Sequence, residues 1–302
     1  MNAILSAAPA EMETPAGTGK APAGRFQRYY EEAGPDYAAW SPRFNMHFGF
    51  FRRGMNPLDR EAMLEQMNLE VLDRLRLASG GSVLDMGCGL GATLRSFARR
   101  MPSARLHGIT LVPWQLEQGR RLNEECREGR SVTLMLGDYE RTRLPAASCD
   151  GVCAVESSCY APGSDKSAFL REAHRLLRPG GRMVVADGFV GGGRWHGPQQ
   201  AIYRRLCECW VIDTFAGVDE FTGEMARIGF RDIVIERIQS RVAPSVLHVP
   251  WITLKFLVSG VVFGRRRMTR ARWNNVLAPI LLPWVSHPFG PVAYYLISAT
   301  RE

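Results

Sequence analysis

The sequence predicts an α/β protein with a doubly wound, mostly parallel sheet, and the residues around position 85 indicate this most strongly. Val83 and Leu84 form a short apolar run that ends in Asp85, as in a buried parallel strand. Three alternating glycines follow, Gly87, Gly89 and Gly91. The next stretch, 93–98, has helical spacing. Glycines let a backbone approach a ligand closely, so we expect a ligand where this strand meets its helix.

The other expected strands are also short apolar runs between helical stretches. They are expected at 106–111, 132–136, 149–157, 182–187, 230–236 and 293–300. Pro179 and Gly180 stop a helix just before the fifth strand. The sheet is therefore expected to have seven strands.

The chain is expected to form one domain with additions at the N-terminus and before the last strand. Its 302 residues, 46% of them hydrophobic, are enough to bury one large core. Residues 1–24 lack periodicity and are expected to be a disordered tail. An aromatic helical cap is expected over 25–78 and the core over 79–302. The core includes an apolar and basic insertion at 240–290, where we expect helices that cap the substrate side.

The excess of positive charge lies entirely in this C-terminal region. The net charge is +8, and nine basic residues but no acidic ones lie between Arg237 and Arg301. The rest of the chain has 29 basic residues against 30 acidic ones. Apolar runs within 246–285 surround an arginine cluster at 265–272 but do not make a convincing transmembrane span. We expect either contact between residues 246–285 and an anionic membrane surface or apolar packing on the sheet beside a solvated basic face.

The seven cysteines point to a reducing compartment. Their number is odd, and Cys88, Cys149 and Cys153 fall on expected core elements. We therefore expect a cytoplasmic protein. If residues 246–285 do contact a membrane, the association is expected to be peripheral.

The glycine turn alone does not decide between a nicotinamide dinucleotide and another nucleotide. Gly87, Gly89 and Ala92 also satisfy the dinucleotide pattern. A dinucleotide site needs an acid at the end of the second strand, and 106–111 contains none. No tyrosine is followed by a lysine four residues later, which disfavours hydride transfer of the common short-chain type.

Asp138 and Tyr139 follow the third strand and offer adenine a carboxylate and an aromatic face. Together with the glycine turn and the later strands, in this order and spacing, they resemble class I S-adenosylmethionine-dependent methyltransferases, which have a Rossmann-like fold. Residues from about 80 to 190 carry this resemblance.

The resemblance implies a set of residues that bind S-adenosylmethionine. Asp85, Gly87, Cys88 and Gly89 would line its methionine end, with Asp138 and Tyr139 at adenine. Most members have an acid after the second strand, which this chain lacks. Instead Thr110 and Leu111, with Gln115, resemble the cyclopropane-synthase branch, in which Thr and Gln serve the ribose and adenine side. In the resembled fold, the strands at 230–236 and 293–300 pair antiparallel at one sheet edge.

A second resemblance lies outside the cofactor core. Eight aromatic side chains, Met46 and His47 fall within 29–51, and Glu156 to Pro162 follow the fourth strand. These segments look like the sterol, tocopherol and prenyl-diphosphate C-methyltransferase group. Tyr160 stands where sterol enzymes have histidine, which argues against a sterol. The aromatic side chains either attach the cap to the core or form walls of the active site.

The chemistry of a methyl sulfonium donor suggests the catalytic residues. Displacement needs a nucleophile held about 3 Å from the methyl carbon and needs no metal. An alkene nucleophile would leave a cation and a proton to accept. We expect Glu156 in that role, assisted by Tyr30, His47 or Tyr160. For a phenol or amine, His47 or Glu156 would be the general base.

The sequence thus predicts methyl transfer to a hydrophobic small molecule, such as an isoprenoid, a sterol-like molecule or another lipid, with carbon as the favoured acceptor. The alternative is O- or N-methylation of a phenolic, quinol or amine natural product. A nucleic-acid methyltransferase is less favoured, because arginines among aliphatic residues suit lipid better than a solvated groove and no Asn-Pro-Pro-Tyr motif is present. A non-catalytic cofactor-binding protein would be expected to have a degraded glycine turn.

Overall fold

The computed structural model describes residues 23–191, 195–259 and 267–302. Residues 1–22, most of the expected tail, lie outside the described residues, and helix α1 already begins at Ala23. Arg265 and Arg266 of the arginine cluster also lie outside them. Within the described residues, no helix is both long and apolar enough to cross a bilayer.

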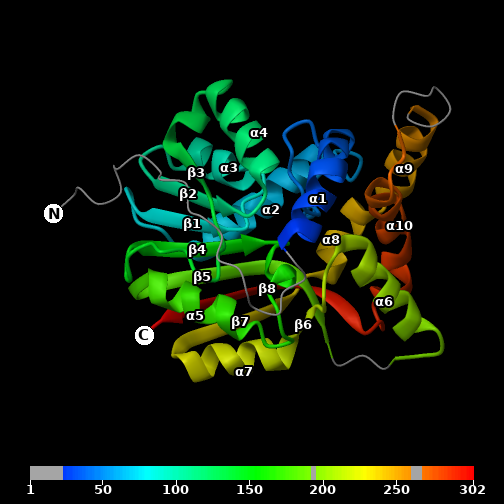
Figure 1. The fold of residues 1–302 in the computed structure, drawn as a ribbon. Helices are drawn as coiled ribbons and strands as arrows, with labels where there is room; N and C mark the ends of the chain where they lie inside the picture. Colours follow the sequence, from blue (N-terminus) through cyan, green and yellow to red (C-terminus); the bar gives the residue numbers. More distant parts are fainter. Residues whose placement is uncertain (1–22, 192–194, 260–266) are drawn as a thin grey trace.

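The molecule is built around one mixed sheet with the strand order β3-β2-β1-β4-β5-β8-β7, and β6 pairs with β5 beside this path (Figure 1). The strands are β1 (Ser82–Met86), β2 (Arg105–Thr110), β3 (Val132–Leu136), β4 (Cys149–Val155), β5 (Leu177–Val190), β6 (Ala216–Gly217), β7 (Phe230–Arg237) and β8 (Val292–Arg301). The seven expected strands are present, and β6 is a two-residue addition. β8 runs antiparallel to β5 and β7, so the antiparallel pair expected at one sheet edge is confirmed.

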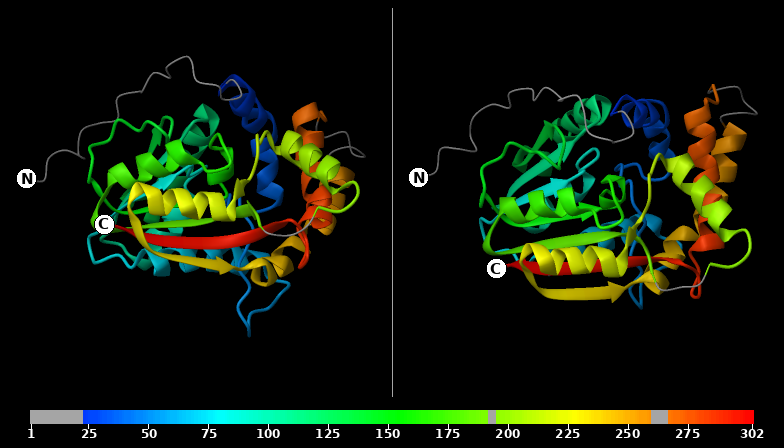
Figure 2. Two further views of the ribbon diagram at one scale, coloured as in Figure 1. Left: turned by 90° about the horizontal axis from the view of Figure 1, so that it is seen from below. Right: turned by 60° about the horizontal axis from the view of Figure 1, so that its bottom comes forward.

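Helices cover both faces of the sheet (Figures 1 and 2). They are α1 (Ala23–Ala33), α2 (Arg60–Leu75), α3 (Ala92–Arg100), α4 (Pro113–Glu124), α5 (Ser167–Leu176), α6 (Gln199–Trp210), α7 (Val218–Ile228), α8 (Gln239–Val246), α9 (Val249–Leu257) and α10 (Arg270–Val285). Three short 3-10 helices are η1 (Gly34–Ala39), η2 (Glu128–Ser131) and η3 (Ser158–Tyr160).

Side chains alternate between two cores because successive strand residues point to opposite faces. Leu84 belongs to the core under α5 and α7, whereas its neighbour Val83 belongs to the core under α2 and α3. Both are completely buried, as the apolar run in the sequence predicts for a strand covered on both faces.

The segment expected as an N-terminal cap has two different structural roles. α1 and η1 lie above the carboxyl ends of the strands, whereas α2 packs on the sheet as part of its helical layer (Figure 1). Asp59 caps α2 by accepting a hydrogen bond from the Ala62 N–H at 2.9 Å.

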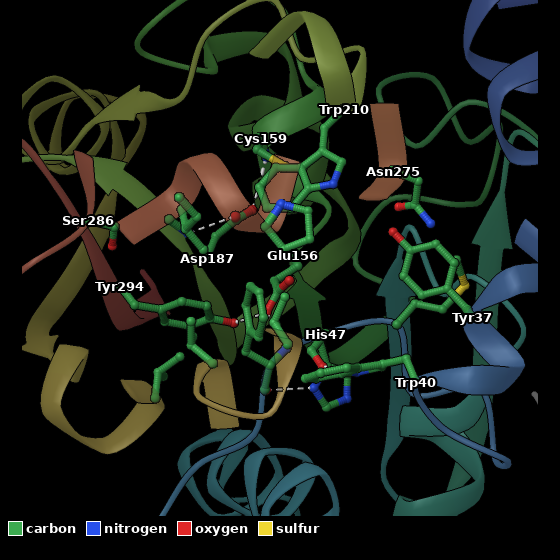
Figure 3. A pocket seen from close by; sticks show the side chains of 18 of the residues that line it. Tyr37, Trp40, His47, Glu156, Cys159, Asp187, Trp210, Asn275, Ser286 and Tyr294 are labelled. Carbon is green, nitrogen blue, oxygen red and sulfur yellow. Dashed lines mark hydrogen bonds between the residues drawn. The ribbon is translucent and has the colours of Figure 1, made fainter. Parts of the chain in front are cut away.

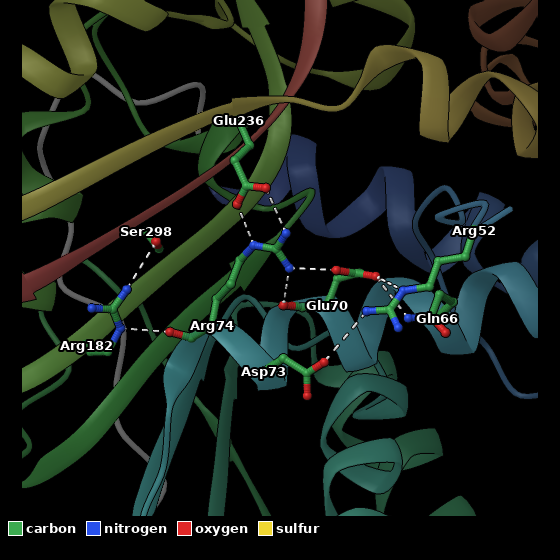
Figure 4. Close-up of polar contacts among 8 residues, drawn as sticks. All are labelled: Arg52, Gln66, Glu70, Asp73, Arg74, Arg182, Glu236 and Ser298. Atoms are coloured by element: carbon green, nitrogen blue, oxygen red, sulfur yellow. Dashed lines mark hydrogen bonds and ion pairs between the residues drawn. The ribbon is translucent and has the colours of Figure 1, made fainter.

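Arg74 attaches α2 to the sheet edge (Figure 4). Its guanidinium binds both carboxylate oxygens of Glu236 on β7, at 2.6 and 2.8 Å, and also Glu70 on its own helix at 2.7 Å. Its backbone carbonyl accepts a hydrogen bond from Arg182 on β5 at 2.7 Å. These paired contacts connect three elements that are far apart in sequence.

Strand order reverses between β1 and β4, which is where doubly wound folds bind ligands. The glycine turn follows β1 and Glu156 follows β4, so both lie at the carboxyl edge of adjacent strands. The 240–290 insertion forms α8, α9 and α10, as expected. With α1 and α6, these helices surround the space beyond this edge (Figure 2).

Candidate active site

The turn after β1 depends on residues without side chains. Gly87, Gly89 and Gly91 all have positive φ, at 97°, 52° and 79°. A Cβ on Gly87 would lie 2.4 Å from the Cβ of Ser157, the residue after Glu156. Only glycine fits there, and the glycine turn therefore lies directly against the segment that carries Glu156.

Asp85 lies at the end of β1 with an unsatisfied oxygen. Its side chain is buried, and its Oδ1 has no hydrogen-bond partner in the described part of the chain. Burial disfavours the carboxylate and raises the pKa of Asp85 to about 7. A buried acceptor of this kind suits an ammonium group, as at the methionine end of the predicted cofactor.

Thr110 and Gln115, the residues predicted for the ribose and adenine side, are in contact. The Thr110 hydroxyl donates to Oε1 of Gln115 at 2.6 Å, and both side chains are buried. The carbonyl of Leu111, between them in sequence, accepts a hydrogen bond from Gln27 on α1 at 2.9 Å. Cys88 lies against β2, where a Cβ on Gly108 would be 2.7 Å from its Sγ.

Asp138 and Tyr139 shape the turn after β3. Asp138 accepts a hydrogen bond from the Glu140 N–H at 2.9 Å. The Tyr139 hydroxyl donates to the Ser157 carbonyl at 3.0 Å, and its ring packs edge-on against Phe169. Tyr139 thus supports the Glu156 segment, and its role beside adenine stays a prediction.

A large cavity opens beyond the carboxyl edge of β4 and β5, with an empty volume of about 1310 Å³ that includes space open to solvent (Figure 3). All four predicted catalytic residues line it: Tyr30, His47, Glu156 and Tyr160. Its other walls come from η1, α6 and the insertion helices, and most are apolar or aromatic. Three carboxyl groups line it, those of Asp36, Glu156 and Asp187, and none of its described lining residues is a lysine or arginine.

Glu156 is held in an uncommon backbone conformation, with φ of 48°. Its Oε1 accepts hydrogen bonds from the Phe48 N–H at 2.6 Å and from the Tyr294 hydroxyl at 2.8 Å (Figure 3). Burial raises the pKa of Glu156 to about 8, although both hydrogen bonds favour the carboxylate. Nearby Asp187 also raises this pKa.

His47 and the tyrosine pair complete this end of the cavity. His47 Nδ1 is 2.9 Å from the Phe48 carbonyl, which can only accept, so Nδ1 carries the proton and Nε2 is the basic nitrogen of the neutral ring. Burial lowers the pKa of His47. The Tyr30 and Tyr160 hydroxyls are 2.8 Å apart, and burial keeps the pKa of each well above its ordinary value.

Sequence reasoning missed several residues of the site. Tyr294 was interpreted only as part of a strand, and nothing in the sequence links it to Glu156. Asp187 could have been predicted as a site residue from the sequence, because it is an acid at the end of a buried strand, as Asp85 is. It accepts hydrogen bonds from the Ser158 hydroxyl at 2.7 Å and the Cys159 N–H at 3.0 Å, which fix η3. Completely buried Lys166 donates to three backbone carbonyls, two of them on that same wall, at Cys159 and Ala161.

Comparison with known proteins identifies the family. Residues 83–181 match the model of a methyltransferase domain. An O-methyltransferase from Pyrenophora dematioidea is 30% identical over 200 residues, which are 66% of this chain and 73% of that protein. The chain belongs to the class I S-adenosylmethionine-dependent methyltransferases. The cofactor is S-adenosylmethionine, as predicted.

Solved methyltransferase structures confirm the fold. Cyclopropane synthase MmaA2 from Mycobacterium tuberculosis superimposes with a TM-score of 0.78 at 16% identity, covering 94% of this chain and 100% of that one. Geranyl diphosphate C-methyltransferase from Streptomyces coelicolor A3(2) gives a TM-score of 0.67 at 16% identity, covering 95% and 100%. In this methyltransferase, Met46 lies between the predicted cofactor residue Gln115 and the cavity. Its Sδ is 4.0 Å from Gln115 Nε2, and Met46 also lines the cavity.

Proposed function

We propose that this methyltransferase acts on an uncharged hydrophobic small molecule, of isoprenoid, sterol-like or other lipid type, bound in the cavity beside Glu156. The charge of the lining carries this proposal. A phosphate or diphosphate needs cationic side chains or a metal ion as partners. The described lining has three carboxyl groups and no cationic side chain.

S-adenosylmethionine, when bound, supplies a methyl group on a positively charged sulfur. The unpartnered oxygen of Asp85 would accept a hydrogen bond from the ammonium of its methionine portion. Thr110, Gln115, Asp138 and Tyr139 would serve its ribose and adenine. The positive charge of the bound cofactor would favour the carboxylate form of Glu156, whose pKa is raised to about 8.

Carbon methylation fits the cavity best. Attack by an alkene leaves a positive charge, which carboxylates and aromatic faces stabilise. Glu156 would accept the proton, held in place by Phe48 and Tyr294. Tyr30 and Tyr160 stay protonated because of their raised pKa values, and they would orient the substrate.

O-methylation is the second candidate, because the Pyrenophora relative is named an O-methyltransferase. For a phenol or quinol, Glu156 or the Nε2 of His47 would remove the hydroxyl proton. A cytoplasmic location with contact to a membrane surface is part of the proposal, because a hydrophobic substrate partitions into membranes.

A substrate panel tests the proposal. The purified enzyme is incubated with labelled methyl donor and with prenyl diphosphates, their uncharged alcohols, sterols, triterpenes and quinol precursors. We expect label to enter uncharged acceptors and to be negligible with the diphosphates. The site of labelling separates carbon from oxygen methylation. Efficient labelling of a diphosphate, with none of its alcohol, would refute the proposed substrate class.

A further inference from the structure

Helices α9 and α10 expose large apolar side chains at helical spacing. On α9 and its end, Trp251, Leu254 and Val258 are 58%, 53% and 42% exposed. On α10, Trp273, Ile280 and Trp284 are 49%, 46% and 64% exposed. The spacings of three, four and seven residues place each set along one side of its helix. We call these two sets the outer apolar stripes.

The opposite sides of the same helices form cavity walls. Ile252, Thr253 and Phe256 of α9 line the cavity, as do Val276, Pro279 and Leu282 of α10. None of the six outer-stripe residues lines it. The two helices pack together at one end of the molecule (Figures 1 and 2). They are therefore apolar toward the cavity and also apolar toward the outside.

Positive charge accompanies the outer apolar stripes. The Lys255 ammonium lies 4.8 Å from the centre of the Trp251 ring. Arg267 and Arg270 are exposed at the start of α10, and no acidic residue occurs between positions 237 and 301. The exposed acids on neighbouring helices are Glu31 of α1 and Glu208 of α6, and Arg205 pairs with Glu208 at 3.1 Å.

We propose that the outer apolar stripes of α9 and α10 dock on a membrane surface that contains anionic lipid. Tryptophan favours the boundary between acyl chains and headgroups, and lysine or arginine beside it binds anionic headgroups. The charge of this surface is complementary to anionic headgroups, because Lys255, Arg267 and Arg270 are exposed and no acidic residue lies between positions 237 and 301. The choice of a lipid surface also rests on the proposed function, because a hydrophobic substrate dissolves in the membrane. Docking would bring the cavity wall to the membrane that contains this substrate.

Vesicle binding tests the proposal with the full-length chain. Cosedimentation is measured with vesicles of phosphatidylcholine alone and of phosphatidylcholine with phosphatidylserine. We expect stronger binding to the anionic vesicles, weakened by added salt. The double variant Trp251→Ser/Trp284→Ser should bind vesicles about tenfold or more weakly, because each substitution removes a large apolar surface from the contact. Lys255→Glu should lose several-fold on anionic vesicles only.

Val234→Ser is the matched control. Val234 is 48% exposed on the edge strand β7, outside the two stripes, so its variant should bind vesicles as the wild type does. Thermal denaturation and cofactor affinity of every variant establish that the fold is retained.

Three results would overturn the docking proposal: no vesicle binding by the wild type, equal binding by the tryptophan variant, or a dimer in gel filtration that the tryptophan variant dissociates. The last result would show that a second copy covers the stripes. Turnover of a detergent-dispersed acceptor is measured separately. A wild type that methylates the acceptor but does not bind vesicles refutes only docking. A wild type that binds vesicles but methylates no acceptor refutes only the proposed function.

Discussion

The hydroxyl of Tyr294 donates a hydrogen bond to Oε1 of Glu156 at 2.8 Å and so joins the last strand to the turn after β4. The same oxygen accepts the Phe48 N–H from the N-terminal segment. Three parts of the chain that are far apart in sequence therefore hold one carboxyl group at the cavity wall. The first prediction concerns that group.

Glu156→Gln should abolish turnover while leaving cofactor affinity within a few-fold of wild type. Glutamine keeps the shape and an oxygen that can accept both hydrogen bonds, but it cannot accept a proton. Steady-state rates and calorimetric titration with S-adenosylhomocysteine measure the two effects. If turnover and cofactor affinity fall together, Glu156 has a binding role instead.

Tyr294→Phe should shift the pH profile of activity upward. The pKa of Glu156 is about 8, and the Tyr294 bond lowers it, so removal of that hydroxyl raises the pKa further. If the carboxylate is the active form, kcat/KM rises with pH through this pKa, and the rise should move to higher pH in the variant. Tyr295→Phe is a control, because Tyr295 lies next in the strand but does not line the cavity. An unchanged pH profile in Tyr294→Phe would show that the Tyr294 hydroxyl does not lower the pKa of Glu156.

S-adenosylmethionine should release more protons on binding near pH 7 than S-adenosylhomocysteine does. Only the former has a positive sulfur, which favours the carboxylate of Glu156, whereas both have the ammonium that would face Asp85. Calorimetry in buffers of different ionisation enthalpy measures the difference. It should vanish in Glu156→Gln. Equal release by both ligands in the wild type would place Glu156 away from the transferred methyl group.

Asp85→Asn should weaken cofactor binding by about tenfold or more and yet stabilise the ligand-free protein at high pH. Because its pKa is about 7 in the folded state, against an ordinary 3.8, the folded protein favours the protonated acid. Stability is therefore lost as pH rises from about 4 through 7. The asparagine variant avoids that loss, on the order of 4 kcal/mol at pH 8. Thermal denaturation at pH 5 and 8 checks the sign, and a stability gain at pH 5 but not at pH 8 would contradict it.

Gly87→Ala should destabilise the protein more than Gly180→Ala. Both glycines have positive φ, 97° and 77°, so both variants carry a similar backbone strain. Only at Gly87 would the new Cβ meet another residue, Ser157. We expect an additional loss of about 2 kcal/mol in the free energy of unfolding. Equal losses in chemical denaturation would show that the glycine turn and the Glu156 segment are not tightly packed.

Local pattern was sufficient to predict most of the fold. The apolar run at 83–84 and the glycines beyond it locate β1 and its turn, because burial on both faces demands apolar residues and positive φ favours glycine. The helical insertion and the antiparallel last strands were also expected correctly. The sequence analysis placed α2 in the cap together with the aromatic segment before it. In the structure the apolar side of α2 packs on the sheet, whereas the aromatic segment faces the cavity.

The sequence by itself determined the glycine turn and the positions of the strands along the chain, because these depend on residue type and short spacing. With the resemblance to known methyltransferases, it also predicted the candidates Tyr30, His47, Glu156 and Tyr160. Only the tertiary structure decided that all four line one cavity, that Tyr294 binds Glu156, and that the described lining has three carboxyl groups but no lysine or arginine. The contacts of Glu156 with Phe48 and Tyr294 join residues more than one hundred positions apart. The pKa of Glu156 is raised mainly because the surrounding elements bury its carboxyl group. No local pattern encodes that environment, because it exists only after the sheet has brought its strand ends together.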